Sequence, residues 1–150
     1  MLKLAKKTDY AIILLSHLGA ATLPVSANEV SKAYSLPYPM VANILKNLVS
    51  SGLIVSSRGQ RGGYMLSRSA ENINLSEIIN ATDNPFKLVE CCKDEYTCKV
   101  HNQCPTKTPL LVLHSKIQRF FEETTLFSII KQTNLNSYFT ESNYEITNLS

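Results

Sequence analysis

The 150-residue sequence has no hydrophobic run long enough to form a membrane-spanning helix. The longest candidate, residues 11–23, is interrupted by Ser16, His17 and Gly19, whereas a span needs about 20 consecutive apolar residues. The N-terminus also shows no apolar core followed by a small-residue cleavage site, the pattern of a signal peptide. We therefore expect a cytoplasmic protein without membrane association.

The sequence also lacks the motifs through which common enzyme classes act. It contains no glycine-rich phosphate-binding motif, no nucleophile-elbow pattern and no metalloprotease helix. A cysteine nucleophile needs a positioned base, and His101 is available but lies on an expected loop. We expect a protein that is not an enzyme. Iron and sulfide analysis separates the alternatives, because a thiol enzyme carries neither.

Acidic residues are scarce in the first half of the chain. Residues 1–70 hold eight Lys/Arg and two acids, whereas residues 71–150 hold seven Lys/Arg and ten acids. A basic half joined to a mildly acidic half is typical of a nucleic-acid reader attached to a sensor. The same asymmetry also arises by chance on a solvated surface, so charge alone leaves both interpretations open.

Hydrophobic periodicity and turn residues divide the chain into short helices and one hairpin. The pattern predicts helices over residues 6–20, 26–33, 37–52, 75–81, 105–123 and 126–131, and strands over residues 53–57 and 64–67. Helix caps are expected at Thr8–Asp9, at Ser26 with Glu29, and at Asn74 with Glu77, while Gly52 is a typical left-handed helix end. In the first helix, we expect Tyr10, Ile13, Leu14, His17 and Leu18 to share one face.

This order of elements predicts a mainly α fold with a small β-wing, the winged helix-turn-helix. We expect a winged helix-turn-helix domain at residues 1–82, a cysteine loop at residues 83–104, and a long-helix region at residues 105–131. In the long helix, an apolar stripe is expected at Leu110, Leu113, Ile117, Phe120 and Phe121. Residues 132–150 are rich in Asn, Ser and Thr and are expected to form a flexible polar tail.

The third helix is the expected recognition helix, because this element enters the major groove in helix-turn-helix proteins. Opposite its core stripe (Val41, Ile44, Leu45, Leu48) lie Tyr38, Pro39, Ala42, Asn43 and Lys46. An asparagine such as Asn43 can pair with adenine, Lys46 can neutralise a phosphate, and Tyr38 can bind phosphate or stack. Each of these residues alone is also compatible with an ordinary exposed helix position.

The hairpin tip carries two arginines among three glycines in residues 58–63. Guanidinium groups favour the narrow minor groove, where the phosphate potential is concentrated, and glycines permit close approach. We therefore expect Arg58 and Arg61 to contact DNA, with Lys3, Lys6 and Lys7 supplying further phosphate contacts. A plain surface hairpin is the alternative.

All four cysteines of the chain fall within 14 residues, between Cys91 and Cys104. Disulfides are disfavoured in the cytosol, so such a cluster indicates metal or redox chemistry. Cys92, Cys98 and Cys104 are spaced C-x5-C-x5-C. Thiolates are the usual ligands of iron–sulfur clusters, but spacing alone leaves a cluster, a zinc site and a thiol switch open.

Several segments together resemble the Rrf2 family of bacterial transcriptional regulators, across about residues 1–131. They are Lys7–Ala11, Leu36–Leu48, Gly52–Ile54 and Arg58–Leu66, and the opening is similar to the Suf-system regulators of that family. The resemblance implies a homodimer held by the long helix near residues 105–123 and bound to a roughly palindromic double-stranded DNA operator. It also implies an iron–sulfur cluster, 2Fe–2S or 4Fe–4S, on the three spaced cysteines, in a repressor that senses iron–sulfur status, redox or nitric oxide.

The resemblance leaves the fourth cluster ligand to be assigned. The iron–sulfur assembly branch uses a histidine three residues after the last cysteine, where this chain has Lys107, which cannot ligate while protonated. The nitric-oxide-sensing branch uses an aspartate in the first helix of the partner subunit, and Asp9 occupies that position, although it can also cap its helix. His101 and Cys91 are nearer in sequence, without support from a family motif. The alternative function is a clusterless regulator of the same fold that uses a thiol switch or a protein partner.

Overall fold

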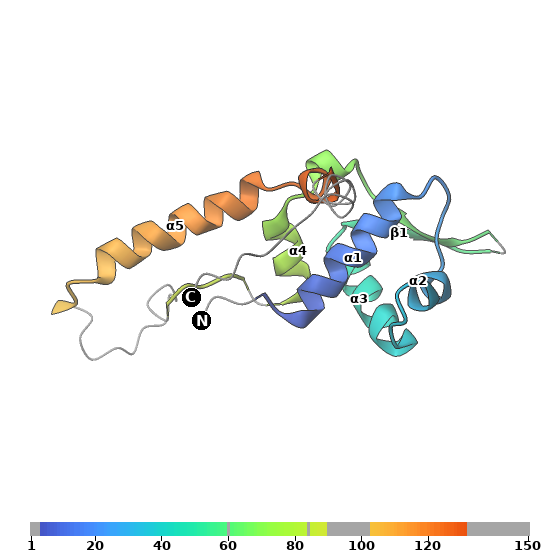
Figure 1. Ribbon diagram of the computed structural model, residues 1–150, viewed down its shortest axis with the longest axis horizontal. Coiled ribbons are helices and arrows are strands. Elements are labelled where there is room, and N and C mark those ends of the chain that lie inside the picture. Colours follow the sequence, from blue (N-terminus) through green and yellow to red (C-terminus); the bar gives the residue numbers. More distant parts are fainter. Residues whose placement is uncertain (1–3, 60, 84, 90–102, 132–150) are drawn as a thin grey trace, which may run out of the picture.

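The computed structural model describes residues 4–59, 61–83, 85–89 and 103–131. In chain order, the named elements are α1 (Lys6–Ala20), α2 (Ala27–Ala33), α3 (Tyr38–Ser50), β1 (Ile54–Ser57), β2 (Gly63–Leu66), η1 (Ala70–Asn72), α4 (Leu75–Thr82) and α5 (Lys107–Glu123). Residues 126–131 form a further short helix. This mainly helical fold with a two-stranded wing confirms the predicted order of elements, and Figure 1 shows α5 extending away from the other helices.

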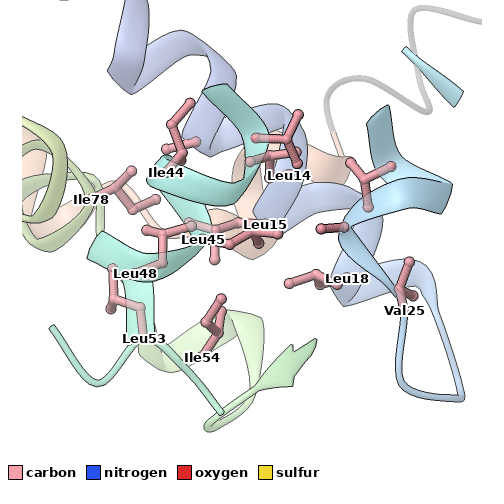
Figure 2. Packing of buried hydrophobic residues seen from close by; sticks show 14 of the residues in the cluster. Leu14, Leu15, Leu18, Val25, Ile44, Leu45, Leu48, Leu53, Ile54 and Ile78 are labelled. Atoms are coloured by element: carbon pink, nitrogen blue, oxygen red, sulfur yellow. The ribbon is translucent and has the colours of Figure 1, made fainter. Parts of the chain in front are cut away.

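The core forms where α1 and α3 pack together, with α4 closing one side. Leu14 and Leu15 of α1 meet Ile44, Leu45 and Leu48 of α3, and all five side chains are fully buried (Figure 2). Burying each such side chain contributes about 1.5–3 kcal/mol to folding. The four residues of the predicted α3 stripe are all buried, so the opposite face of this helix is directed outward.

The face of α1 that the sequence predicts is only partly buried. Leu14 and Leu18 are buried, but Tyr10, Ile13 and His17 are only half-buried, and the remaining buried positions are Thr8, Ala11 and Leu15. Helix α1 contacts α3, α4 and β2, so its buried surface is set by several neighbours rather than by one stripe.

Capping was predicted correctly for α2 and α4. Ser26 with Glu29, and Asn74 with Glu77, each form a capping box in which side chains satisfy free backbone N–H groups at the helix start. The predicted cap of α1 was wrong. Its N-cap is Ala5, without a side-chain cap, and Thr8 lies inside the helix, where its Oγ1 is 2.9 Å from Oγ1 of Thr82.

The wing is a two-stranded antiparallel sheet that is fixed to the body by a short bridge. Ile54 pairs with Leu66 and Ser57 with Gly63, while Val25 and Tyr64 exchange hydrogen bonds of 3.0 and 2.8 Å. A Cβ atom at Gly63 would lie 2.7 Å from the carbonyl oxygen of Val25, so only glycine permits this close approach. Glycine is therefore required at residue 63, where the wing is joined to the body.

Helix α5 joins the body through its C-terminal end. Phe121 is buried against Leu75 and Ile79 of α4, and the predicted apolar stripe therefore divides into two faces. Other large apolar side chains of α5 are exposed, at 51% for Val112, 44% for Leu113 and 62% for Phe120. Among the described helices, none is long and apolar enough to cross a membrane.

Candidate functional site

The outward face of α3 presents the side chains that the sequence analysis predicted. Tyr38, Pro39, Asn43 and Lys46 are exposed, and Ala42 is half-buried. Pro37 is the N-cap and Pro39 lies in the first turn, where a missing backbone N–H costs no helical hydrogen bond. The first turn of α3 holds no acidic residue, so its positive dipole end is not neutralised by a side chain of that turn.

The tip of the wing carries exposed positive charge. Arg58 and Arg61 are both exposed, and within the described residues neither takes part in an ion pair or a hydrogen bond. Gly59 has φ +115°, and its carbonyl accepts the N–H of Gly62 at 3.0 Å, which closes the turn. The tip is thus a narrow turn with two available guanidinium groups.

Arg68 has a structural role that the charge count did not distinguish. Its Nη2 pairs with Oε1 of Glu77, and its Nε donates to the carbonyl of Asn72 at 2.8 Å. Because Glu77 also caps α4, this arginine joins the end of the wing to that helix. Its positive charge is therefore partly balanced, unlike the charges of Arg58 and Arg61.

The basic residues near α1 are only partly covered by the structure. Lys3 lies outside the described residues. Lys7 is exposed, and the ammonium of Lys6 lies 5.7 Å from the ring centroid of Tyr10, a cation–π geometry. His17 of the same helix contacts Tyr34, whose hydroxyl is 3.2 Å from Nδ1.

Of the predicted cluster ligands, only Cys104 and Asp9 fall within the described residues, while Cys92, Cys98 and His101 lie outside them. Cys104 is half-buried just before α5, with its Sγ 3.3 Å from Oγ1 of Thr106. Hydrogen bonding from the side chain and backbone of Thr106, helped by Lys107, lowers the pKa of the Cys104 thiol. This favours the thiolate, which is the form that ligates metals.

Asp9 is an exposed residue in the first turn of α1, and among the described residues its side chain has no hydrogen-bond or ion-pair partner. Asp9 does not cap α1, so helix capping, the alternative role that the sequence left open for this carboxylate, is not observed. Within the described part of the chain, no three His, Cys, Asp or Glu side chains gather as a metal site.

Sequence reasoning missed the contacts that hold residues 85–89 on α5. Phe86 stacks on His114, with centroids 5.4 Å apart and an interplanar angle of 12°, and its edge meets Phe121 at 5.1 Å. The backbone N–H of Leu88 donates to Nδ1 of His114 at 3.4 Å. The segment has neither helical nor strand periodicity, so no pattern could predict these partners.

Comparison with known proteins gives one consistent result. Residues 4–132 match the model of the Rrf2 family, described as iron-dependent transcriptional regulators. The HTH-type transcriptional regulator NsrR of Oceanobacillus iheyensis is 31% identical over 136 residues, covering 87% of this chain and 90% of that protein. The corresponding regulator IscR of Yersinia pseudotuberculosis is 25% identical, covering 89% of this chain and 82% of that protein.

The fold also matches solved structures. CymR, the global cysteine regulator of B. subtilis, superposes with a TM-score of 0.69 at 23% identity, covering 88% of this chain and 98% of that one. This likeness supports the winged-helix architecture that the elements already indicate.

Proposed function

Because the chain belongs to the Rrf2 family of transcriptional regulators, we propose that it is a dimeric repressor whose DNA affinity is controlled by an iron–sulfur cluster. The family and the relatives are regulators, so the chain is a DNA-binding transcriptional regulator and not an enzyme. Cys92, Cys98 and Cys104 would hold the cluster, and the observation that carries the proposal is their C-x5-C-x5-C spacing in a chain that belongs to the Rrf2 family. Its site of action is the cytoplasm, and its signal is iron–sulfur status, redox or nitric oxide.

The DNA-binding surface in this proposal combines α3 with the tip of the wing. Tyr38, Asn43 and Lys46 face outward at the start and middle of α3, where they can reach base edges and phosphates in the major groove. Arg58 and Arg61 extend this surface toward the minor groove. Lys3 and Lys7 supply phosphate contacts. Pro39 and Ala42 belong to the same surface, because they lie on the same face of α3 as Asn43.

Removing both wing arginines is expected to weaken DNA binding. We expect Arg58→Ala with Arg61→Ala to lower affinity about 10- to 100-fold, and to reduce the slope of log K against log salt by about one for each phosphate that is no longer neutralised. Fluorescence anisotropy at several salt concentrations measures both quantities. Lys131→Ala, an exposed cation distant in sequence from the wing, is the charge control. Wild-type affinity and slope in the double variant would contradict the role of the wing.

The proposed dimer uses the exposed apolar face of α5. Three large apolar side chains on this face contribute little buried surface to the isolated chain: Val112, Leu113 and Phe120. A second copy of α5 would bury them. A two-fold symmetric dimer places two α3 helices on half-sites about one helical turn of DNA apart, which favours a roughly palindromic operator. The long-helix region, residues 105–131, is thus proposed as the dimerisation region. The division into a reader at residues 1–82, a cysteine loop at 83–104 and a tail at 132–150 remains a prediction.

The cysteine loop and the dimer helix adjoin directly. Cys104 precedes α5 by three residues, and the N–H of Lys107 donates to the Cys104 carbonyl at 3.4 Å. When bound, the cluster, 2Fe–2S or 4Fe–4S, would supply a redox-active group that reacts with oxygen or nitric oxide. A rearrangement of the loop would then shift the first turn of α5 and change the spacing of the two α3 helices.

Asp9 of the partner subunit is the proposed fourth ligand, because its carboxylate is exposed and without another partner among the described residues. We expect Asp9→Ala to change the visible absorption of the anaerobic protein and to shorten the lifetime of the cluster in air. Asp9→Cys should retain the cluster, since thiolate is the stronger ligand. Asp83→Ala removes another exposed aspartate as the control. An unchanged spectrum and lifetime in Asp9→Ala would assign the fourth position elsewhere, with His101 the next candidate.

Anaerobic purification followed by visible absorption and iron and sulfide analysis tests whether a cluster is present. Iron and sulfide in comparable amounts, with visible absorption, are the expected result. A colourless protein containing zinc or no metal would contradict the cluster. It would favour the second candidate, a thiol switch, which is supported by the lowered pKa of the Cys104 thiol.

A further inference from the structure

A small cavity lies between α4, residues 85–89 and α5. Its described lining includes no cysteine and no predicted DNA-contacting residue. Its volume is about 200 Å³. Two buried side chains, Ile79 and Phe121, contribute apolar surface, and Phe86 and His114 form an aromatic wall. The pocket is partly open to solvent, and its volume is comparable with the roughly 150 Å³ of a cavity that holds a benzene-sized molecule, so it has room for one aromatic ring with a small substituent.

The polar groups around the cavity include several hydrogen-bond donors. Because Nδ1 of His114 accepts the N–H of Leu88, the neutral imidazole carries its proton on Nε2, which is therefore a donor. Lys87 adds an ammonium and Asn80 an amide. The amide of Gln118 gives one N–H to Glu122 at 3.2 Å and keeps the second. Among the described residues that line the cavity, none is acidic.

We propose that this cavity binds a small carboxylate with a flat apolar body. The buried Ile79 and Phe121 would contact the apolar body, while the carboxylate would accept from Lys87 and from Nε2–H of His114. A charge-assisted hydrogen bond to a carboxylate is about twice as strong as one to a neutral acceptor, so the neutral amide of the same shape should bind more weakly. The occupied cavity would also hold residues 85–89, the first part of the cysteine loop, on α5.

Benzoate is a suitable probe for this site. With isoleucine methyl groups labelled in the full-length protein, we expect benzoate to shift the Ile79 methyl resonance with a Kd of about 1 mM, while the Ile54 resonance in the main core stays unchanged. Benzamide should bind at least about tenfold more weakly, and benzylamine, a cation, should not compete. No shift of Ile79 at about 20 mM benzoate, or equal binding of benzamide, would overturn the proposal.

Two variants separate recognition of the carboxylate from general apolar binding. Lys87→Ala should weaken benzoate binding about fivefold or more without changing benzamide binding. His114→Phe keeps an aromatic ring beside Phe86 but removes the Nε2–H donor, and it should likewise bring benzoate toward the affinity of benzamide. Lys131→Ala is the charge control, with wild-type binding expected. Wild-type benzoate affinity in a folded Lys87→Ala protein would contradict the proposal. Iron content and DNA affinity are separate readouts, so a failure here is distinguishable from a failure of the cluster.

Discussion

Replacing Cys98 and Cys104 with alanine is expected to abolish iron and sulfide binding and, with it, all dependence of DNA affinity on the cluster. One remaining thiolate of three cannot hold a cluster that is bound mainly by cysteine. Coupling between two sites typically changes affinity about 5- to 150-fold, and the double variant should lose that entire factor. Elemental analysis and anisotropy on one anaerobic preparation measure the two effects together.

Cys91→Ala is the matched control for this experiment, because it removes a thiol from the same segment outside the C-x5-C-x5-C spacing. It should keep wild-type iron and sulfide. Full iron and sulfide in the double variant would place the metal elsewhere. An affinity change that persists without iron would instead assign the switch to another group.

Introducing glutamate at Leu113 and Phe120 is expected to separate the dimer and to reduce operator affinity by about 100-fold or more. These side chains are 44% and 62% exposed in the single chain, so the substitutions cost the isolated fold little. In a paired α5 interface, four buried carboxylates would oppose one another without partners. Two linked DNA-binding domains bind about 10²- to 10⁴-fold more tightly than one, and a monomer loses this gain in affinity.

Ser115→Glu is the control on the same helix. Ser115 is exposed, and its hydroxyl donates only within α5, to the carbonyl of Leu111 at 3.0 Å. This variant should remain dimeric and bind DNA normally, as measured by light scattering and anisotropy. A Leu113→Glu, Phe120→Glu protein that remains dimeric and retains wild-type affinity would contradict an interface on this face of α5.

Local signals predicted most elements of the fold. The Ser26–Glu29 and Asn74–Glu77 capping boxes depend on residues three positions apart, and both form as expected. The stripe of α3 is buried in full, since that helix covers the core with a single face. Gly52 takes φ +73° after α3, in agreement with its expected place at the helix end. These features depend on residues that are close together in the sequence, so the local sequence is enough to predict them.

The errors arose where a partner distant in sequence decides the outcome. Thr8 is buried because Thr82 lies opposite it, so a residue that is a typical cap lies inside the helix. Arg68 counted as surface charge, but Glu77 pairs with it. The stripe of α5 reads as one face, whereas the contact with α4 buries Phe121, partly covers Ile117 and leaves Phe120 exposed. Periodicity identifies a helix and its faces but does not identify the neighbours that cover them.

The same distinction between local patterns and distant partners applies to the candidate site. Exposure of Asn43 and Lys46 follows from helical periodicity, because the opposite face of α3 is buried. The cysteine spacing supplies three ligands of one kind without their geometry. The fourth ligand is proposed to come from a second subunit, and a distance between subunits leaves no spacing in the sequence. His114 likewise gains its role through Leu88, 26 residues away.

Control of DNA binding by the cluster is tested most directly by comparing DNA affinity with and without the cluster in one preparation. A duplex selected from a random-sequence pool would be titrated with anaerobic protein, and then with the same protein after removal of iron by a chelator, at constant salt. We expect the two dissociation constants to differ by about fivefold or more, and this difference to be absent in the Cys98→Ala, Cys104→Ala protein. Equal dissociation constants for protein with and without iron and sulfide would contradict control of DNA binding by the cluster.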